Sequence, residues 1–130
     1  MGSNRIATRI LASITASFLA VVGLGVTASP ASAAFDGHCG NGEFCLYYNT
    51  NLSGGVADFS NNISNYAGYN FWGTGGGLND NAASAHNNGN WQDVHLHEAA
   101  NYSGANLEFN VGVKRNTLGA MANRGSSHKW

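Results

Sequence analysis

Positive charge is scarce in this chain once its N-terminal segment is set aside. After residue 33 the only basic residues are Lys114, Arg115, Arg124 and Lys129, against seven acidic residues. Residues 34–130 therefore carry a net charge of −3 with histidine neutral. We expect no nucleic-acid partner, because nucleic-acid binding depends on a basic patch. The same charge argues against a cationic, membrane-active role.

Long apolar runs are also missing, with one exception near the N-terminus. Residues 10–26 are apolar apart from a few Ser and Thr, they follow Arg5 and Arg9, and Ala31-Ser32-Ala33 comes next. A positive start, an apolar centre and a small-x-small cleavage site predict a secretory signal peptide over residues 1–33. The mature protein, residues 34–130, is then extracellular and has the size of one small domain. No other run approaches membrane length, so we predict no membrane span.

Cysteine is limited to Cys39 and Cys45. In a secreted protein the default for such a pair is one disulfide, here closing a small loop near the mature N-terminus. It would stabilise the fold by about 2–3 kcal/mol. A redox-active or metal-binding pair is the alternative, but the C-x-x-C spacing and a second ligand pair are absent.

Catalytic motifs and helical periodicity are the remaining absences. The chain has no nucleophile elbow, no H-E-x-x-H and no paired-carboxylate arrangement, so we predict that it is not an enzyme. Nowhere does an apolar period of 3.6 residues persist for three turns, which limits helix to a turn or two. Tyrosine, tryptophan and phenylalanine are nevertheless spread along the whole mature chain and indicate a packed core.

An internal repeat is the main feature that is present. Residues 46–59, LYYNTNLSGGVADF, align without a gap on residues 96–109, LHEAANYSGANLEF. Five of the fourteen positions are identical, where average composition gives about one. Chance matches are easier in a chain rich in Asn, Ser and Gly, but the matched Leu and Phe ends favour a duplication.

Short segments of strand character predict an all-β fold built on this duplication. We expect strands at 44–48, 56–59, 69–72 and just after the polar loop 78–85 in the first half, with Phe44, Leu46 and Tyr48 on one face. Residues 87–90 then form a turn, and strands follow at 91–98, 105–109, 111–115 and 126–130. Eight strands in two sets of four predict a two-sheet antiparallel sandwich of Greek-key repeats, at about 43–88 and 91–130.

The repeat also has a spacing that resembles a known signature. Tyr47 is followed after four residues by Leu52 and then by Gly54; His97 is followed likewise by Tyr102 and Gly104. This resembles the βγ-crystallin signature aromatic-x4-aromatic-x-Gly, with one aromatic replaced in each copy. In that signature the first two strands form a folded hairpin, whose Gly takes a positive φ that a Cβ would strain.

Two polar loops resemble the calcium loop of the same family, Asn/Asp-Asn/Asp-x-x-Ser/Thr-Ser. They are residues 80–85, DNAASA, and residues 122–127, ANRGSS, which correspond at an offset of 42. Repeat one would then carry eight extra residues between Phe59 and Leu78. With its signal peptide, early disulfide and C-terminal NRGSSHKW, the chain is similar to the small secreted actinobacterial proteins of peptidase inhibitor family 36, which have a βγ-crystallin fold.

This resemblance implies a proteinaceous inhibitor, typified by a metalloprotease inhibitor, that blocks an extracellular protease by loop insertion. The family's characterised inhibitor braces its reactive loop with a second disulfide, which this chain lacks, so no residue here matches the reactive bond. By shape, the candidate contact loop runs from 69 to 80, and its contact residues would be Tyr69, Phe71, Trp72 and Leu78. The alternative is an ordinary connection, made flexible by four glycines, whose aromatics complete the core.

The other functions implied by the resemblance are a calcium-binding or structural module and a killer-toxin-like secreted protein whose exposed aromatics stack on sugars. No cofactor is required, and calcium would bind weakly, because only one of the implied ligands is charged. Those ligands are Asp80, Asn81, Ser84, Asn123 and Ser126. Alternatively, the hydroxyls of Ser84 and Ser126 cap the folded hairpins. We expect the protein to be a monomer.

Overall fold

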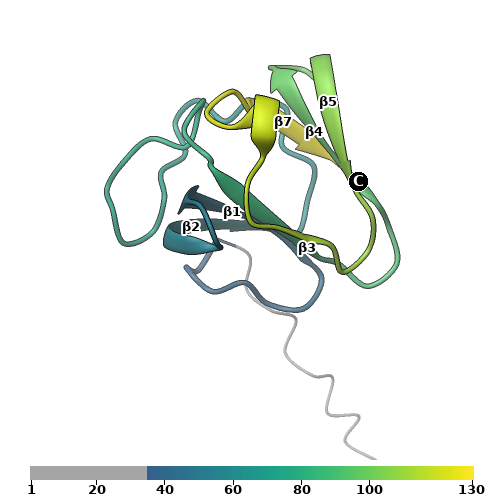
Figure 1. Cartoon of the computed structure of the whole chain (residues 1–130), viewed down its shortest axis with the longest axis horizontal. Helices are drawn as coiled ribbons and strands as arrows, with labels where there is room; N and C mark the ends of the chain where they lie inside the picture. The colour runs from purple at the N-terminus through teal and green to yellow at the C-terminus, as the bar shows by residue number, and fades with distance from the viewer. Residues whose placement is uncertain (1–34) are drawn as a thin grey trace, which may run out of the picture.

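The computed structural model describes residues 35–130, so the predicted signal peptide lies outside the described residues (Figure 1). Within this range the chain forms seven strands and one short 3-10 helix, η1. The strands are β1 (Glu43–Asn49), β2 (Ser53–Phe59), β3 (Ser84–Asn88), β4 (Val94–Ala99), β5 (Ser103–Phe109), β6 (Lys114–Arg115) and β7 (Ser127–Lys129), and η1 spans Gly119–Met121. No helix in residues 35–130 is long and apolar enough to cross a membrane.

Two antiparallel sheets face each other, one with the order β2-β1-β3-β6 and the other with the order β5-β4-β7. Figure 1 shows β1, β2 and β3 in one layer and β4, β5 and β7 in the second. Side chains from both layers fill the space between them: the rings of Phe44 on β1 and Phe109 on β5 meet at 5.2 Å. The predicted all-β sandwich is confirmed.

Both repeats contain the folded hairpin that the glycine spacing predicts. Gly54 and Gly104 have φ of 81° and 76°. Another residue would be strained there by the positive φ, and on Gly54 its Cβ would also lie 2.7 Å from the side-chain nitrogen of Asn49, which would have to move. The strand register also shifts at equivalent places, between Tyr47 and Asn49 and between His97 and Ala99.

The end of β1 differs from the prediction. Phe44 and Leu46 are fully buried, whereas Tyr48, which was expected on the same face, is 44% exposed. Because the register shifts just before Asn49, the alternation of the strand breaks there and Tyr48 leaves the core. Its ring instead forms a T-shaped pair with that of Phe71, with the ring centroids 5.6 Å apart.

The predicted strand at 69–72 is wrong. Only isolated bridges occur there, from Trp72 to Val56 and from Asn70 to Gly77, because the Gly-rich segment turns back at once. The segment of repeat one that pairs in the third-strand position is instead Ile63, through a single bridge to His128. The turn predicted at 87–90 is also shorter, since Asn87 and Asn88 belong to β3.

Each repeat supplies its third strand to the sheet of the other. β6, the shortened form of the strand predicted at 111–115, pairs with β3 through Ala85–Arg115 and His86–Lys114. Ile63 of repeat one correspondingly joins β7 of repeat two. Two backbone bonds repeat this exchange at the hairpin bends: the Asn51 N–H donates to the carbonyl of Asn116 (2.8 Å), and the Asn101 N–H donates to that of Ser64 (2.6 Å).

The predicted disulfide between Cys39 and Cys45 is present and ties the first described residues to β1. The carboxylate of Asp58 on β2 accepts backbone N–H groups from Asp36 and Gly37, both at 2.9 Å. The N-terminal segment is therefore held by a covalent bond and by a buried carboxylate.

Candidate functional sites

The inserted segment of repeat one forms a hairpin-like loop against the edge of β2; it projects at the left of Figure 1. Backbone bonds close it on the inside, from the Leu78 N–H to the Tyr69 carbonyl (2.8 Å) and from the Phe71 N–H to the Gly76 carbonyl (2.9 Å). Trp72 and Val56 exchange both of their backbone bonds, at 2.8 and 3.2 Å. The four glycines thus do not leave the segment untethered.

Only part of the predicted protease-contact set is available at the surface. Phe71 and Leu78 are buried in the core. Tyr69 is half-buried and forms a T-shaped pair with Phe59, with the ring centroids 5.3 Å apart. Trp72 is 49% exposed, and its indole N–H donates to the carbonyl of Phe35 at 3.1 Å. Three of the four aromatic or aliphatic candidates therefore complete the core or its margin, as the alternative interpretation predicted.

The exposed tip of this loop adjoins an open cavity of about 290 Å³. Its lining is mostly aromatic side chains and glycine backbone: Phe35, Asn70, Phe71, Trp72, Gly73 and Gly75. Gly73 and Gly75 both have positive φ, 87° and 68°, which sets the direction of the tip. The site can present backbone groups and one indole ring to a partner.

The two polar loops lie side by side and bond reciprocally. The Asp80 N–H donates to the Gly125 carbonyl (3.0 Å), and the Asn123 N–H donates to the Ala82 carbonyl (2.8 Å). Asp80 and Asn123 share a φ of 58°. The loops are therefore equivalent at an offset of 43, not 42, and repeat one has seven extra residues rather than eight.

The corrected offset makes Ser127, not Ser126, the counterpart of Ser84. The Ser84 hydroxyl accepts the Leu52 N–H (3.0 Å) and donates to the Asn49 carbonyl (2.6 Å). The Ser127 hydroxyl does the same with Tyr102 N–H (3.1 Å) and the Ala99 carbonyl (2.6 Å). These two serines cap the folded hairpins. Ser84 therefore has the alternative role that the sequence allowed for it, whereas in repeat two this role belongs to Ser127 and not to Ser126.

Ser126 instead joins the two polar loops, because its hydroxyl donates to the carboxylate of Asp80 at 3.0 Å. Asn81 donates from its side chain to the Gly77 carbonyl at 2.8 Å and thereby ties the first polar loop to the inserted segment. The predicted calcium ligands thus lie in one region, but several already bond within the protein.

Each polar loop borders an open pocket, and the two pockets correspond through the repeat. One, of about 490 Å³, is lined by Tyr48, Asn49, Thr50, Asn81, Ala83 and Asn123. The other, of about 460 Å³, is lined by Asp80, Glu98, Ala99, Asn123, Arg124 and Ser126. Calcium takes six to eight oxygen ligands, with carboxylates among them in its stronger sites. The first pocket has no carboxylate in its lining.

The second pocket has two carboxylates but also holds a cation of its own. Arg124, at the position equivalent to Asn81, forms an ion pair with Glu98. The donors around this pocket therefore do not fit a calcium ion while the guanidinium is in place. No group of three or more His, Cys, Asp or Glu side chains in this range is arranged to hold a metal ion.

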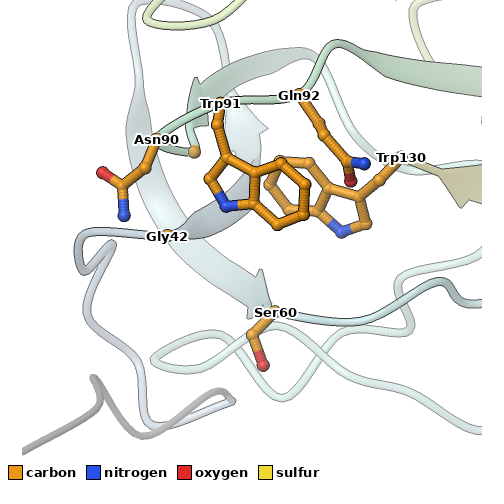
Figure 2. Close-up of a pocket in the computed structure, with 7 residues that line it drawn as sticks. Gly42, Ser60, Asn90, Trp91, Gln92 and Trp130 are labelled. Carbon is orange, nitrogen blue, oxygen red and sulfur yellow. The ribbon is translucent and has the colours of Figure 1, made fainter.

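A further pocket, of about 100 Å³, lies where the two repeats join (Figure 2). It is lined by Gly42, Ser60, Gly89, Asn90, Trp91, Gln92 and Trp130. The sequence predicts a turn and the start of a strand here but no site. Its one signal is a tryptophan directly after a polar turn, and the contribution of Trp130 becomes visible only when the C-terminus folds back.

Solved structures with this architecture show the fold class. The fold is similar to a βγ-crystallin domain from work on the evolution of the eye lens fold, at 20% identity and a TM-score of 0.59, covering 72% of this chain and 91% of that one. It is also similar to a βγ-crystallin from an archaeon, at 20% identity and a TM-score of 0.53, covering 69% and 98%. A βγ-crystallin from Ciona intestinalis matches at 16% identity and a TM-score of 0.55, covering 68% and 98%.

Within this fold class, the sequence identifies the family. Residues 32–109 match the profile of Peptidase inhibitor family I36, which is more than half of the chain. The chain therefore belongs to that family. No protein of curated function matches it.

Proposed function

We propose that this protein is a secreted peptidase inhibitor that blocks an extracellular protease with the exposed tip of its inserted loop, residues 72–76. The observation that carries the proposal is the family match, which spans residues 32–109 and includes that loop. The predicted signal peptide supports secretion.

The geometry of the loop supports this role. Tight inhibitors present a segment whose conformation is already that of the complex, because ordering a free loop on binding costs affinity. Here Phe71 and Leu78 are buried at the two sides of the tip, and Trp72 is bonded to Val56 of β2. These anchors restrict both sides of the tip, which supports presentation of the loop without a second disulfide.

The exposed Trp72 is the one large apolar side chain on the tip, and interface energy is concentrated in such residues. Its neighbours Gly73, Thr74 and Gly75 add little bulk, so the backbone of the tip is accessible to a protease cleft. We propose that Trp72 fills a protease subsite while the glycine backbone lies along the cleft.

A titration of proteases tests this function. Purified mature protein is added to a thermolysin-like metalloprotease and to a subtilisin-like serine protease, and residual activity on a small substrate is measured. We expect saturable inhibition of at least one enzyme, with Trp72→Ala weakening it by about tenfold or more. Trp91→Ala, which removes another exposed tryptophan, is the matched control and should inhibit normally. If excess protein leaves both enzymes active and is itself degraded, the inhibitor role fails for those classes.

Weak calcium binding is a second candidate function, and the observation that favours it is the pairing of Asp80 and Glu98 around one pocket. Calcium would have to displace the guanidinium of Arg124 from Glu98. We therefore propose a dissociation constant no tighter than the extracellular range, about 10⁻⁴–10⁻³ M. Calorimetry at millimolar calcium measures it, and the absence of both heat and a melting shift would remove this candidate.

A further inference from the structure

We propose that the pocket between Trp91 and Trp130 is a carbohydrate-binding site that takes one pyranose ring of a neutral polysaccharide. This site lies at the junction of the two repeats, apart from the loop proposed to contact a protease. Its ligand class follows from three observations: an exposed indole ring, a rigidly held surround, and a lining that has amides but no charged side chain.

The exposed ring belongs to Trp91, which is 77% accessible to solvent, the largest exposure among the large apolar residues of the range 35–130. Figure 2 shows its indole projecting from the chain into the pocket, with the Trp130 indole lining the same space. An indole is a flat apolar surface with a polar edge, and such rings are favoured where a ligand has one apolar side and one wet side. The C–H face of a pyranose meets that description.

The turn that carries Trp91 is held from below by Asn87, which is fully buried at the end of β3. Its side-chain nitrogen donates to the carbonyls of Gln92 (3.0 Å) and Phe109 (2.9 Å), and its oxygen accepts the Gly89 N–H (2.9 Å). One side chain therefore fixes both ends of the segment 89–92. The ring of Trp91 is presented on an ordered support.

Trp130 is held just as closely. A Cβ on Gly89 would lie 2.4 Å from its ring, so only glycine allows the indole to pack over the turn. The backbone N–H of Trp130 donates to the side-chain oxygen of Asn62 at 2.9 Å. On the opposite wall, the N–H of Gly42 donates to the Asn88 carbonyl at 2.8 Å, which ties the disulfide-closed segment to the pocket.

The polar groups of the lining select the ligand. Asn90 and Gln92 have amides that both donate and accept hydrogen bonds, and Figure 2 shows these amides on either side of the Trp91 ring. Sugar hydroxyls also donate and accept, so each amide can bond one hydroxyl of a ring that stacks on Trp91. None of the seven lining residues has a charged side chain, which favours a neutral sugar over a uronic acid, a phosphate or a charged peptide. The cavity of about 100 Å³ is smaller than a typical ligand pocket, so the sugar ring would stack on Trp91 at its mouth and not fill it.

Binding to insoluble and soluble polysaccharides tests the proposal. The mature protein is incubated with cellulose, with chitin and with amylose as neutral probes and with alginate as an anionic one, and the bound fraction and the tryptophan fluorescence are measured. We expect binding to at least one neutral polysaccharide, and no binding to alginate that survives about 0.15 M salt. Binding to none of the neutral probes, or salt-sensitive binding to alginate alone, overturns the proposal.

Two variants locate the site. Trp91→Ala should weaken the neutral-polysaccharide binding by about tenfold or more, and Gln92→Ala by a smaller factor. Both positions are exposed, and circular dichroism checks that each variant folds. Trp72→Ala is the matched control and should bind normally. If Trp91→Ala binds as well as the natural protein, the site is elsewhere and the proposal fails. Because Trp91→Ala should still inhibit a protease, loss of this function and loss of the inhibitor function are distinguishable.

Discussion

The two repeats share their backbone bonding and differ in what they place on it. Both fold their first hairpin with a positive-φ glycine, both cap it with a serine hydroxyl, and each donates a bend N–H to the other. Repeat one alone carries the disulfide and the inserted loop. Repeat two alone carries His128 and the ion pair of Arg124 with Glu98. The shared hairpins and caps form the sandwich, whereas the features found in one repeat only form the candidate sites.

The clearest difference within the core is the pair Ala85 and His128, which are equivalent at the offset of 43. Ala85 is a small apolar residue, whereas His128 is fully buried among Phe44, Phe59 and Tyr66. The Tyr66 hydroxyl donates to His128 Nδ1 at 2.7 Å, and His128 Nε2 donates to the Asn61 carbonyl at 3.0 Å. Burial is the main cause that lowers the pKa of His128 to about 3.

The largest expected effect is therefore a loss of stability in acid that arises in repeat two. The unfolded chain protonates His128 below its ordinary pKa of about 6.5, while the folded protein does not until about pH 3. The contribution of neutral His128 to the free energy of unfolding is complete well above pH 6.5. It is lost as the pH falls towards 3, by about 1.4 kcal/mol per pH unit and roughly 4–5 kcal/mol in all. Urea unfolding at pH 7.5 and pH 5, above most carboxylate titration, should show about 2 kcal/mol of this loss.

A His128→Gln variant should lose most of this pH dependence, while the exposed His38→Gln should keep it. Burial also lowers the pKa of His86 and of His97, so some dependence with the same sign should remain in His128→Gln. Proton NMR gives a second readout that does not depend on how well the variant folds. A His128 ring signal that titrates near pH 6.5 in the folded natural protein would contradict the prediction.

The disulfide Cys39–Cys45 occurs in repeat one and has no counterpart in repeat two, so its removal tests a feature of one repeat alone. The double variant Cys39→Ser/Cys45→Ser should lower the free energy of unfolding by about 2–3 kcal/mol, because the unfolded chain gains the freedom of the closed loop. Thermal and urea unfolding at pH 7 measure the loss, and the natural protein under reducing conditions is the comparison. An unchanged midpoint would mean that the bonds of Asp58 hold the N-terminal segment without the disulfide.

Replacing the capping serines tests whether the repeats are equivalent. Ser84→Ala and Ser127→Ala should each lower the free energy of unfolding by about 2 kcal/mol, since each leaves one bend N–H and one carbonyl without a partner. Ser126→Ala, one residue away and outside this pattern, is the matched control with a smaller expected loss. If Ser126→Ala costs more than Ser127→Ala, the offset of 43 is wrong.

The smallest expected change in stability comes from Arg124, because its ion pair is at the surface and is worth less than about 1 kcal/mol. Arg124→Asn introduces the residue type that repeat one has at Asn81 and removes the guanidinium that occupies the pocket beside Glu98. We expect calcium affinity to rise by about tenfold or more, measured by calorimetry. Lys129→Asn removes a positive charge elsewhere and serves as the control. Equal calcium affinity in the natural protein and Arg124→Asn would show that the guanidinium does not compete.

Most of the architecture could be predicted from the sequence because the duplication has a backbone cause. Gly54 and Gly104 take positive φ, and the matched Phe59 and Phe109 both end a strand in the core. The third strand of repeat one escaped prediction and that of repeat two is shorter than predicted, because both are short and are exchanged. The pairing of Ile63 with His128 joins residues far apart in the sequence, and a single bridge leaves no alternating pattern.

The candidate sites were less predictable, since they depend on exposure and on distant neighbours. The pattern around Phe71 and Leu78 does not reveal that these side chains face the core while Trp72 faces solvent. Likewise, no local signal places Arg124 against Glu98 or brings Trp130 into the pocket of Trp91. Residue type suggested which side chains could act, but only the tertiary arrangement shows which of them are free to do so.

The exchange of third strands also bears on how quickly the chain folds. β3 of repeat one cannot gain its outer partner until β6 has formed. Likewise, Ile63 cannot pair until β7, at the C-terminal end of the chain, is in place. Closing these long loops costs chain entropy before the sheets compensate for it. We expect folding on the millisecond-to-second scale of β-sandwiches, in a single transition that involves both halves at once. A chain cut between the repeats would leave strand edges without partners, and such edges are open to pairing with other molecules.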